Sequence, residues 1–127
     1  VLLISTGPQT SRCLAAAVLL ESTGVSAGVL HVPSIKPVDA HAIVAAVGRS
    51  SLVISVEEHS VIGGLGGLIA EILTTHLPRR LVRIGLEDCW GESAPNDFLL
   101  EKHGLAAARV ADRVRLEIQD SPTRRKA

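Results

Sequence analysis

The side chains best suited to chemistry stand together at Glu57-Glu58-His59-Ser60, directly after an apolar run at 52–56. A carboxylate beside an imidazole can shuttle a proton, or hold a neighbouring subunit through hydrogen bonds. Successive side chains of a strand point to opposite faces, so Glu57 and Glu58 need not act together. A polar strand end at the mouth of a sheet explains the same residues, and we favour that interpretation over an acid–base pair.

A glycine-rich segment at 63–67 follows this cluster and raises the question of nucleotide binding. After Gly64 and Gly66, the position for a third glycine is Ile69, so the G-x-G-x-x-G fingerprint is absent, as is G-x-x-x-x-G-K-[ST]. We therefore expect these glycines to permit a tight turn and a close approach of helix and sheet. Their backbone N–H groups could still hold an anion at the start of a helix.

The other histidines and the cysteines predict no catalytic, cofactor-binding or metal-binding residue. The histidines His31, His41, His76 and His103 lack the spacing of metal ligands. We expect His41 and His103 to be exposed and His76 to be half-buried at a helix end. Cys13 lies among Leu and Ala residues, which predicts a small core residue. Cys89 has no histidine near it in sequence, and we interpret it as structural.

Three arginines, Arg79, Arg80 and Arg83, form a small basic group. They could pair with Glu87 and Asp88 or hold one phosphate. These arginines are also expected at a strand edge that is exposed to solvent, and we favour that interpretation.

Short apolar runs alternate with amphipathic stretches, which predicts βαβ units. The predicted strands are 1–5, 27–32, 52–56 and 81–86, and the predicted helices are 12–21, 37–48, 65–76, 96–103 and 106–118. The expected buried faces are Cys13, Leu14, Ala17 and Val18 in the first helix and Ile43, Val44 and Val47 in the second. Right-handed crossovers then predict a three-layer α/β/α domain with a doubly wound, mostly parallel sheet in the order 2-1-3-4.

In such a sheet, ligands bind at the carboxyl ends of the strands where the strand order reverses. Here that point lies between the first and third strands. It brings together a candidate interface or anion site made of Thr6, Gly7, Glu58, His59, Ser60, Gly63 and Gly64. One hypothesis for this site is a regulatory module that binds a nucleotide or a phosphate.

The composition of the chain excludes several classes of protein. The 127 residues carry 13 basic and 13 acidic side chains, and the aromatics are only Trp90 and Phe98, which argues against a nucleic-acid binder. Apolar residues make up 46% of the chain, enough for one core, and no apolar run is long enough to span a membrane. We expect a cytoplasmic domain over 1–119 with a polar tail over 120–127. The start at Val1, within an expected strand, suggests a piece of a longer protein.

Four stretches in order resemble the C-terminal domain of transketolase-type enzymes, which depend on thiamine diphosphate. They are Leu3-Ile4-Ser5-Thr6-Gly7, Ser34-Ile35-Lys36-Pro37-Val38-Asp39, Ser55 to Gly66 (SVEEHSVIGGLG), and Trp90 to Pro95 followed by Leu99 to Leu105. They are similar to the family segments "LIATG", "IKPLD", "VEEH…GGLG" and "FGESG…LL…GL". The resemblance covers residues 1–118, with Trp90 standing where the family often has Phe.

The resemblance implies an enzyme of three domains that moves two-carbon ketol units between sugar phosphates, in the pentose phosphate pathway. Thiamine diphosphate and magnesium would lie between a diphosphate-binding and a pyrimidine-binding domain, at the interface of a homodimer. The third domain would hold no cofactor, pack on the pyrimidine-binding domain and help to build the dimer. It would be inactive alone. An additional antiparallel strand upstream would complete a five-stranded mixed sheet, and its absence would leave a strand edge open.

The resemblance leaves the subfamily open. Deoxyxylulose-phosphate synthases and the β-subunits of 2-oxo acid dehydrogenases share the domain, and the segment Gly91-Glu92-Ser93-Ala94 favours transketolase over the dehydrogenase subunits. A split transketolase, whose C-terminal subunit carries the pyrimidine-binding and third domains, is a close candidate.

Overall fold

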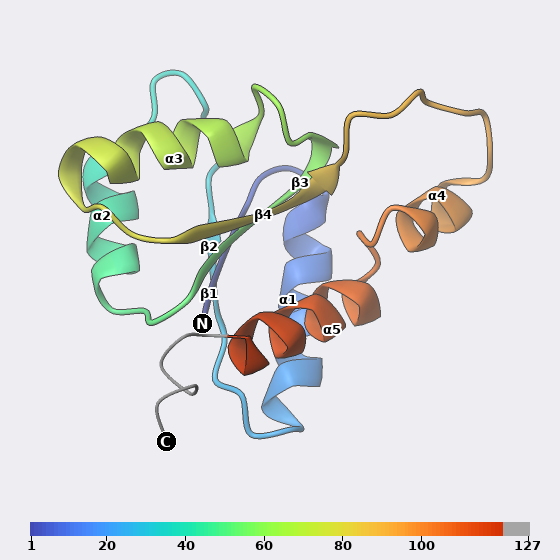
Figure 1. Cartoon of the computed structure of the whole chain (residues 1–127), viewed down its shortest axis with the longest axis horizontal. Helices are drawn as coiled ribbons and strands as arrows, with labels where there is room; N and C mark the ends of the chain where they lie inside the picture. Colours follow the sequence, from blue (N-terminus) through green and yellow to red (C-terminus); the bar gives the residue numbers. More distant parts are fainter. Residues whose placement is uncertain (121–127) are drawn as a thin grey trace.

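The computed structural model describes residues 1–120, which form one parallel sheet with helices on both faces (Figure 1). The strands are β1 (Leu2–Ser5), β2 (Gly28–His31), β3 (Val53–Ser60) and β4 (Leu81–Leu86). They pair in the order β2-β1-β3-β4, and all three pairings are parallel. This confirms the predicted order. It follows that β1 and β3 are the central strands of the described sheet, and β2 and β4 are its edges.

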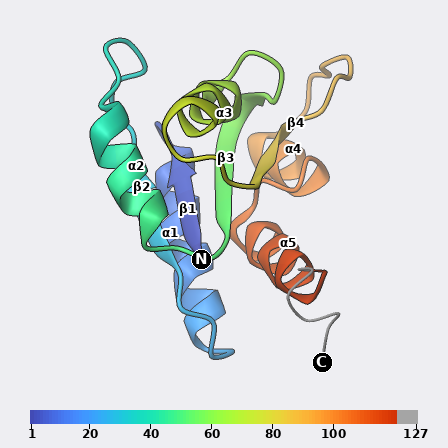
Figure 2. The same ribbon diagram turned by 60° about the vertical axis from the view of Figure 1, so that its left-hand side comes forward.

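Five helices complete the three layers: α1 (Gln9–Glu21), α2 (Ala40–Gly48), α3 (Leu65–His76), α4 (Asn96–Lys102) and α5 (Ala107–Gln119). Helices α1 and α5 pack on one face of the sheet, and α2 and α3 pack on the other (Figures 1 and 2). Strand β1 serves both cores, because Leu3 points to the α1/α5 side while Leu2 and Ile4 point to the α2/α3 side. The α/β/α prediction is therefore confirmed.

Helix α1 begins at Gln9, earlier than predicted, and buries a different face. The prediction that Leu14 and Val18 are buried is wrong, since 55% and 67% of these residues are exposed. The buried side chains are Gln9, Cys13, Ala16 and Leu20. Gln9 Nε2 donates a 2.9 Å hydrogen bond to the carbonyl of Leu105, far along the chain. The packing of α1 against α5 and the sheet thus decides which side of the helix is buried. The spacing of apolar residues alone indicated the wrong side.

Helix α2 begins at Ala40, whereas the sequence predicted a start at Pro37. Asp39 is its N-cap: Oδ1 accepts a 2.9 Å hydrogen bond from the backbone N–H of Ala42. Of the predicted buried face, Ile43 and Val47 are buried and Val44 is half-buried. The side-chain cap satisfies an N–H that the first turn leaves free, which explains the later start.

In the part of the chain that the structure describes, no helix is both long enough and apolar enough to cross a membrane. Within the same residues, no three His, Cys, Asp or Glu side chains are grouped so that they could hold a metal ion. The predicted polar tail falls, beyond Asp120, outside the described residues.

Candidate functional site

The predicted switch point is a cleft of about 510 Å³ at the carboxyl ends of β1 and β3. Six of the seven predicted residues line it, namely Thr6, Gly7, Glu58, His59, Gly63 and Gly64. The other lining residues are Pro8, Ile35, Glu57, Leu65, Gly67, Leu68 and Glu71. The topology therefore brings these segments together as the sequence predicted, although they lie more than 50 positions apart. The role of the cleft stays a prediction.

Ser60 is the predicted residue that does not line the cleft. It ends β3, and its Oγ accepts a 3.1 Å hydrogen bond from the backbone N–H of Ile62. This local bond closes the turn between β3 and α3. The serine therefore shapes the loop beside the cleft.

Glu57 is the site residue that the prediction omitted. Its side chain is buried: Oε2 accepts a 2.5 Å hydrogen bond from the N–H of Leu65, and Oε1 accepts a 2.9 Å bond from the N–H of Gly66. A carboxylate at this place offsets the positive end of the α3 dipole and satisfies two free N–H groups. The anion that the glycine-rich helix start could hold is thus a carboxylate of the chain itself.

Two glycines make room for this carboxylate. A Cβ on Gly64 would lie 1.9 Å from Glu57 Oε2, and a Cβ on Gly85 would lie 2.9 Å from Glu57 Cγ and 2.8 Å from the His59 carbonyl. The close approach of helix and sheet predicted from the glycine run is therefore confirmed at Gly64. These glycines were the signal in the sequence that could have indicated a buried partner.

Strand β3 continues past its predicted end and carries an irregularity where the site begins. Val56 pairs with Ile84 and Ser60 pairs with Leu86, so four positions along β3 are opposite two along β4. Between these pairs, three residues of β3, namely Glu57, Glu58 and His59, lie opposite the single residue Gly85. A bulge of this kind interrupts the regular pairing of two strands and is common beside functional sites. Here its residues line the cleft.

Glu58 faces the opposite way from Glu57, as the strand geometry predicted. Its Oε2 accepts a 2.6 Å hydrogen bond from Arg12 Nη1, which also donates to Gln9 Oε1 over 2.9 Å. His59 is exposed, and its Nδ1 lies 3.0 Å from the carbonyl oxygen of Ser60. Because Glu58 is engaged by Arg12 and His59 by the backbone, the two do not form an acid–base pair in this structure.

The charges in the cleft are negative. Glu57, Glu58 and Glu71 all line it, and its described lining includes no Lys or Arg. Arg12 offsets the charge of Glu58 from outside this lining, but a phosphate would still meet Glu71 and the buried Glu57 with no Lys or Arg in the described lining. The electrostatics thus favour a cationic occupant over an anionic one.

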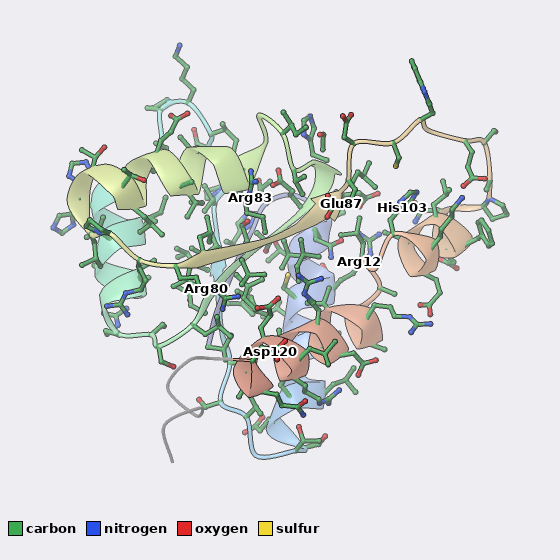
Figure 3. The ribbon with its side chains drawn as sticks, viewed as in Figure 1. Arg12, Arg80, Arg83, Glu87, His103 and Asp120 are labelled. Carbon is green, nitrogen blue, oxygen red and sulfur yellow. The ribbon has the colours of Figure 1, made fainter. Side chains whose placement is uncertain are left out.

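The predicted arginine group divides between two faces of β4 (Figure 3). Arg80 lies on the α5 side and donates a 2.6 Å bond to Glu117, whereas Arg83 lies on the α3 side and donates a 2.9 Å bond to the carbonyl of Val61. Arg79 donates to the carbonyl of Ser50. All three arginines are exposed at this edge of the sheet, which agrees with the favoured interpretation of a solvated strand edge, and their bonds give them a structural role.

Glu117 is buried between two guanidinium groups. Arg80 and Arg113 donate hydrogen bonds of 2.6 Å and 2.9 Å to its two oxygens. Burial by itself raises the pKa of this carboxyl, but the two arginines outweigh burial, and the net result is a pKa below the ordinary value. This cluster ties α5 to β4.

The thiol of Cys13 is buried, as predicted, and burial raises its pKa to about 11 against the smaller lowering effects of Ser5 and Arg12. A thiol with this pKa is a poor nucleophile at neutral pH. Cys89 is exposed in the loop after β4. Neither cysteine is therefore placed as a catalytic group.

The histidines fit the predictions only in part. His41 is exposed, as expected, but His76 is exposed and His103 is half-buried, the reverse of the prediction. His103 follows α4 and lines a surface pocket together with Arg109 and Arg113 of α5. Tertiary contacts of the short helix α4, invisible in the sequence pattern, decide its burial.

Comparison with known proteins places the chain in a family. The family described as "Transketolase, C-terminal domain" matches residues 1–110. The chain is 39% identical over 110 residues to the 6-deoxy-6-sulfo-D-fructose transketolase subunit SqwH of Clostridium sp., covering 87% of this chain and 34% of that protein. It is 36% identical over 120 residues to a 1-deoxy-D-xylulose-5-phosphate synthase of Synechococcus sp., covering 94% of this chain and 18% of that one.

A solved structure, "Split gene transketolase, inactive beta4 tetramer", matches 90% of this chain and 37% of its own chain, with a TM-score of 0.83 and 40% identity. The chain spans 36% and 34% of the length of the first two curated relatives, so it corresponds to about a third of such proteins. The match to the family covers the cleft and every strand of the sheet. The chain belongs to the transketolase family, through its match to the C-terminal domain of that family.

Proposed function

We propose that this chain is a structural, partner-binding domain of an enzyme that transfers two-carbon ketol units between sugar phosphates, and that it is inactive alone. The observation that carries this proposal is that a carboxylate of the same chain already binds the N-terminus of α3. The carboxylate of Glu57 takes the N–H groups of Leu65 and Gly66, which are the groups a substrate phosphate could use in this fold. Chemistry is therefore assigned to the rest of the enzyme.

The residues of the cleft do not fit the cofactor that the family implies. Thiamine diphosphate carries an anionic diphosphate, and magnesium needs several oxygen ligands. The described cleft offers the diphosphate no Lys or Arg. Within residues 1–120, no three carboxylates, cysteines or histidines gather as metal ligands. The cofactor and magnesium belong, in this proposal, to the diphosphate-binding and pyrimidine-binding domains.

The relatives support a domain that works within an assembly. One is named as a transketolase subunit, and the solved relative is titled an inactive tetramer of beta chains. This chain then acts as a domain or subunit of a homodimeric enzyme. A cytoplasmic setting fits its two free thiols, at Cys13 and Cys89, because reducing compartments keep cysteines unpaired.

Calorimetry and a ketol-transfer assay test the proposal. The 127-residue chain alone should neither bind thiamine diphosphate nor transfer ketol units, and the whole enzyme should do both. Micromolar affinity of the isolated chain for the cofactor contradicts the proposal. A whole enzyme that binds the cofactor but transfers no ketol unit contradicts the assigned reaction.

A second candidate function is a regulatory phosphate or nucleotide site in the cleft. The observation in its favour is that Thr6, Gly7, His59 and Gly63 converge on one cavity of about 510 Å³. Thermal-shift screening with nucleotides and sugar phosphates tests it. A flat response across the panel ends this hypothesis, and the negative charge of the cleft favours that outcome.

A further inference from the structure

Three loops at one end of the molecule each display a large exposed hydrophobic side chain. The loops follow the carboxyl ends of β2, β3 and β4, at 32–39, 61–64 and 87–95, and share that end in both views (Figures 1 and 2). Their exposed side chains are Ile35 at 46%, Ile62 at 63% and Trp90 at 99%. We call these loops with the cleft the carboxyl edge. Of the three side chains, Ile35 lines the cleft itself. Exposed large apolar side chains at one end of a domain are typical of an interaction surface.

Trp90 is the strongest feature of this edge. Its indole is almost wholly in water. The loop that carries it, 87–95, stands away from the body of the molecule (Figure 1). A short backbone bond of 2.7 Å, from the N–H of Cys89 to the carbonyl of Glu87, shapes the base of this loop. Tryptophan leads the residues that anchor protein interfaces, because it buries a large apolar area with few rotatable bonds. The loop therefore presents an anchor that residues 1–120 leave uncovered.

The charges of the carboxyl edge indicate the chemistry of that partner. Glu71 and Glu58, the latter already paired with Arg12, line the cleft, and Glu87 and Asp88 are exposed at the base of the Trp90 loop. Against these carboxylates, the loops at 32–39, 61–64 and 87–95 carry a single cation, Lys36. A second copy that met this edge across a two-fold axis would oppose its own carboxylates, which is unfavourable. A partner with cationic side chains around an apolar centre is complementary.

We propose that the carboxyl edge is the docking surface for the remainder of the enzyme, with Trp90 as its anchor. The partner presents an apolar pocket to the indole and a Lys or Arg side chain to the acidic cleft. This inference rests on the proposed function for the identity of the partner. It adds which surface of the domain binds and by what contacts. The exposed face of α1, with Leu14 and Val18, serves as the internal control.

The test uses the whole enzyme labelled with 5-fluorotryptophan. The fluorine resonance of Trp90 is the one lost in Trp90→Phe, and its shift between H₂O and D₂O reports exposure to solvent. We expect Trp90 to lose this solvent shift in the whole enzyme. We also expect hydrogen exchange to be slow at 61–64 and 87–95 there. Since an anchor dominates an interface, Trp90→Ala should speed exchange at 61–64 by about tenfold or more.

Matched variants separate docking from general instability. Glu71→Lys should speed exchange in the same loops, because it places a cation against the cationic partner, whereas Glu21→Lys on α1 should not. Val18→Ser, at a side chain that is 67% exposed, is the control for Trp90→Ala. Equal effects of variant and control overturn the inference.

Each remaining outcome has one meaning. A whole enzyme that transfers ketol units while Trp90 keeps its full solvent shift overturns the inference and leaves the proposed function standing. A whole enzyme without ketol transfer, but with Trp90 buried, supports the surface and contradicts the proposed reaction. Trp90 burial that the 127-residue chain reaches alone, at the same concentration, shows that a second copy covers the edge and overturns the assigned partner.

Discussion

Glu57 and Leu65 are joined by a 2.5 Å hydrogen bond, from the backbone N–H that opens α3 to a buried carboxylate oxygen on β3. This bond crosses from the sheet to the helix layer. With the second bond to Gly66, it fixes the start of α3 beside the cleft. Because Glu57 is enclosed by protein, its contribution should be larger than that of an exposed ion pair.

Replacement of Glu57 by Gln should therefore destabilise the domain. The amide keeps the shape but can accept at one oxygen only, so one N–H of α3 faces a donor. We expect the free energy of unfolding in urea to fall by about 2 kcal/mol. The control is Glu58→Gln, which removes the partly exposed pair with Arg12 and should cost less than about 1 kcal/mol. Equal losses in the two variants contradict the role assigned to Glu57.

Two glycines of the same segment should respond in opposite directions. A Cβ at Gly64 meets the Glu57 carboxylate at 1.9 Å, whereas a Cβ at Gly67 has nothing within 4 Å. Gly64→Ala should cost about 2 kcal/mol or more through overpacking. Gly67→Ala should stabilise helix α3 by about 0.5–1 kcal/mol. Thermal and urea unfolding measure both changes, and a neutral Gly64→Ala refutes the close approach.

Glu117 should make stability depend on pH on the acid side. Burial opposes its ionised form, but Arg80 and Arg113 outweigh burial and hold its pKa below the ordinary value of 4.5 in the folded chain. A lowered folded-state pKa contributes stability that is fully present above pH 4.5 and is lost as the pH falls through the folded-state pKa. The difference in unfolding free energy between wild type and Glu117→Gln should therefore shrink between pH 7 and acid pH.

The matched control for that measurement is Glu101→Gln. Glu101 pairs with Arg109 at the surface, with about half of each side chain exposed. Its removal should leave the pH dependence close to that of the wild type. A difference for Glu117→Gln that stays constant with pH refutes the electrostatic explanation.

The two cysteines should differ in reactivity. Cys13 is buried with its pKa raised to about 11, and Cys89 is exposed. Iodoacetamide at pH 8 should modify one thiol in the folded chain and two in urea, as counted by mass spectrometry. In Cys89→Ser, labelling of the folded chain should almost cease. Rapid labelling of that variant shows that α1 opens readily and contradicts the packed core.

Much of the architecture could be predicted from the sequence, because the order of strands and helices follows from local apolar patterns and from the handedness of crossovers. The meeting of Thr6 and Gly7 with His59 and Gly63 follows from that order alone. Helix α1 shows where this reasoning fails. Leu14 and Val18 have the right spacing for burial, yet contacts with α5 and the sheet select Ala16 and Leu20.

The sequence by itself determined the fold class, the family and the position of the cleft, since each depends on patterns that are local or repeated in order along the chain. Only the tertiary structure decided that Glu57 is buried and Glu58 is not. Strand alternation places the two on opposite faces, and the approach of α3 decides which of them is enclosed. The exposure of Trp90 likewise depends on what packs around its loop. The burial of these side chains is decided by contacts between segments that are distant in the sequence. The local sequence around each residue does not determine those contacts.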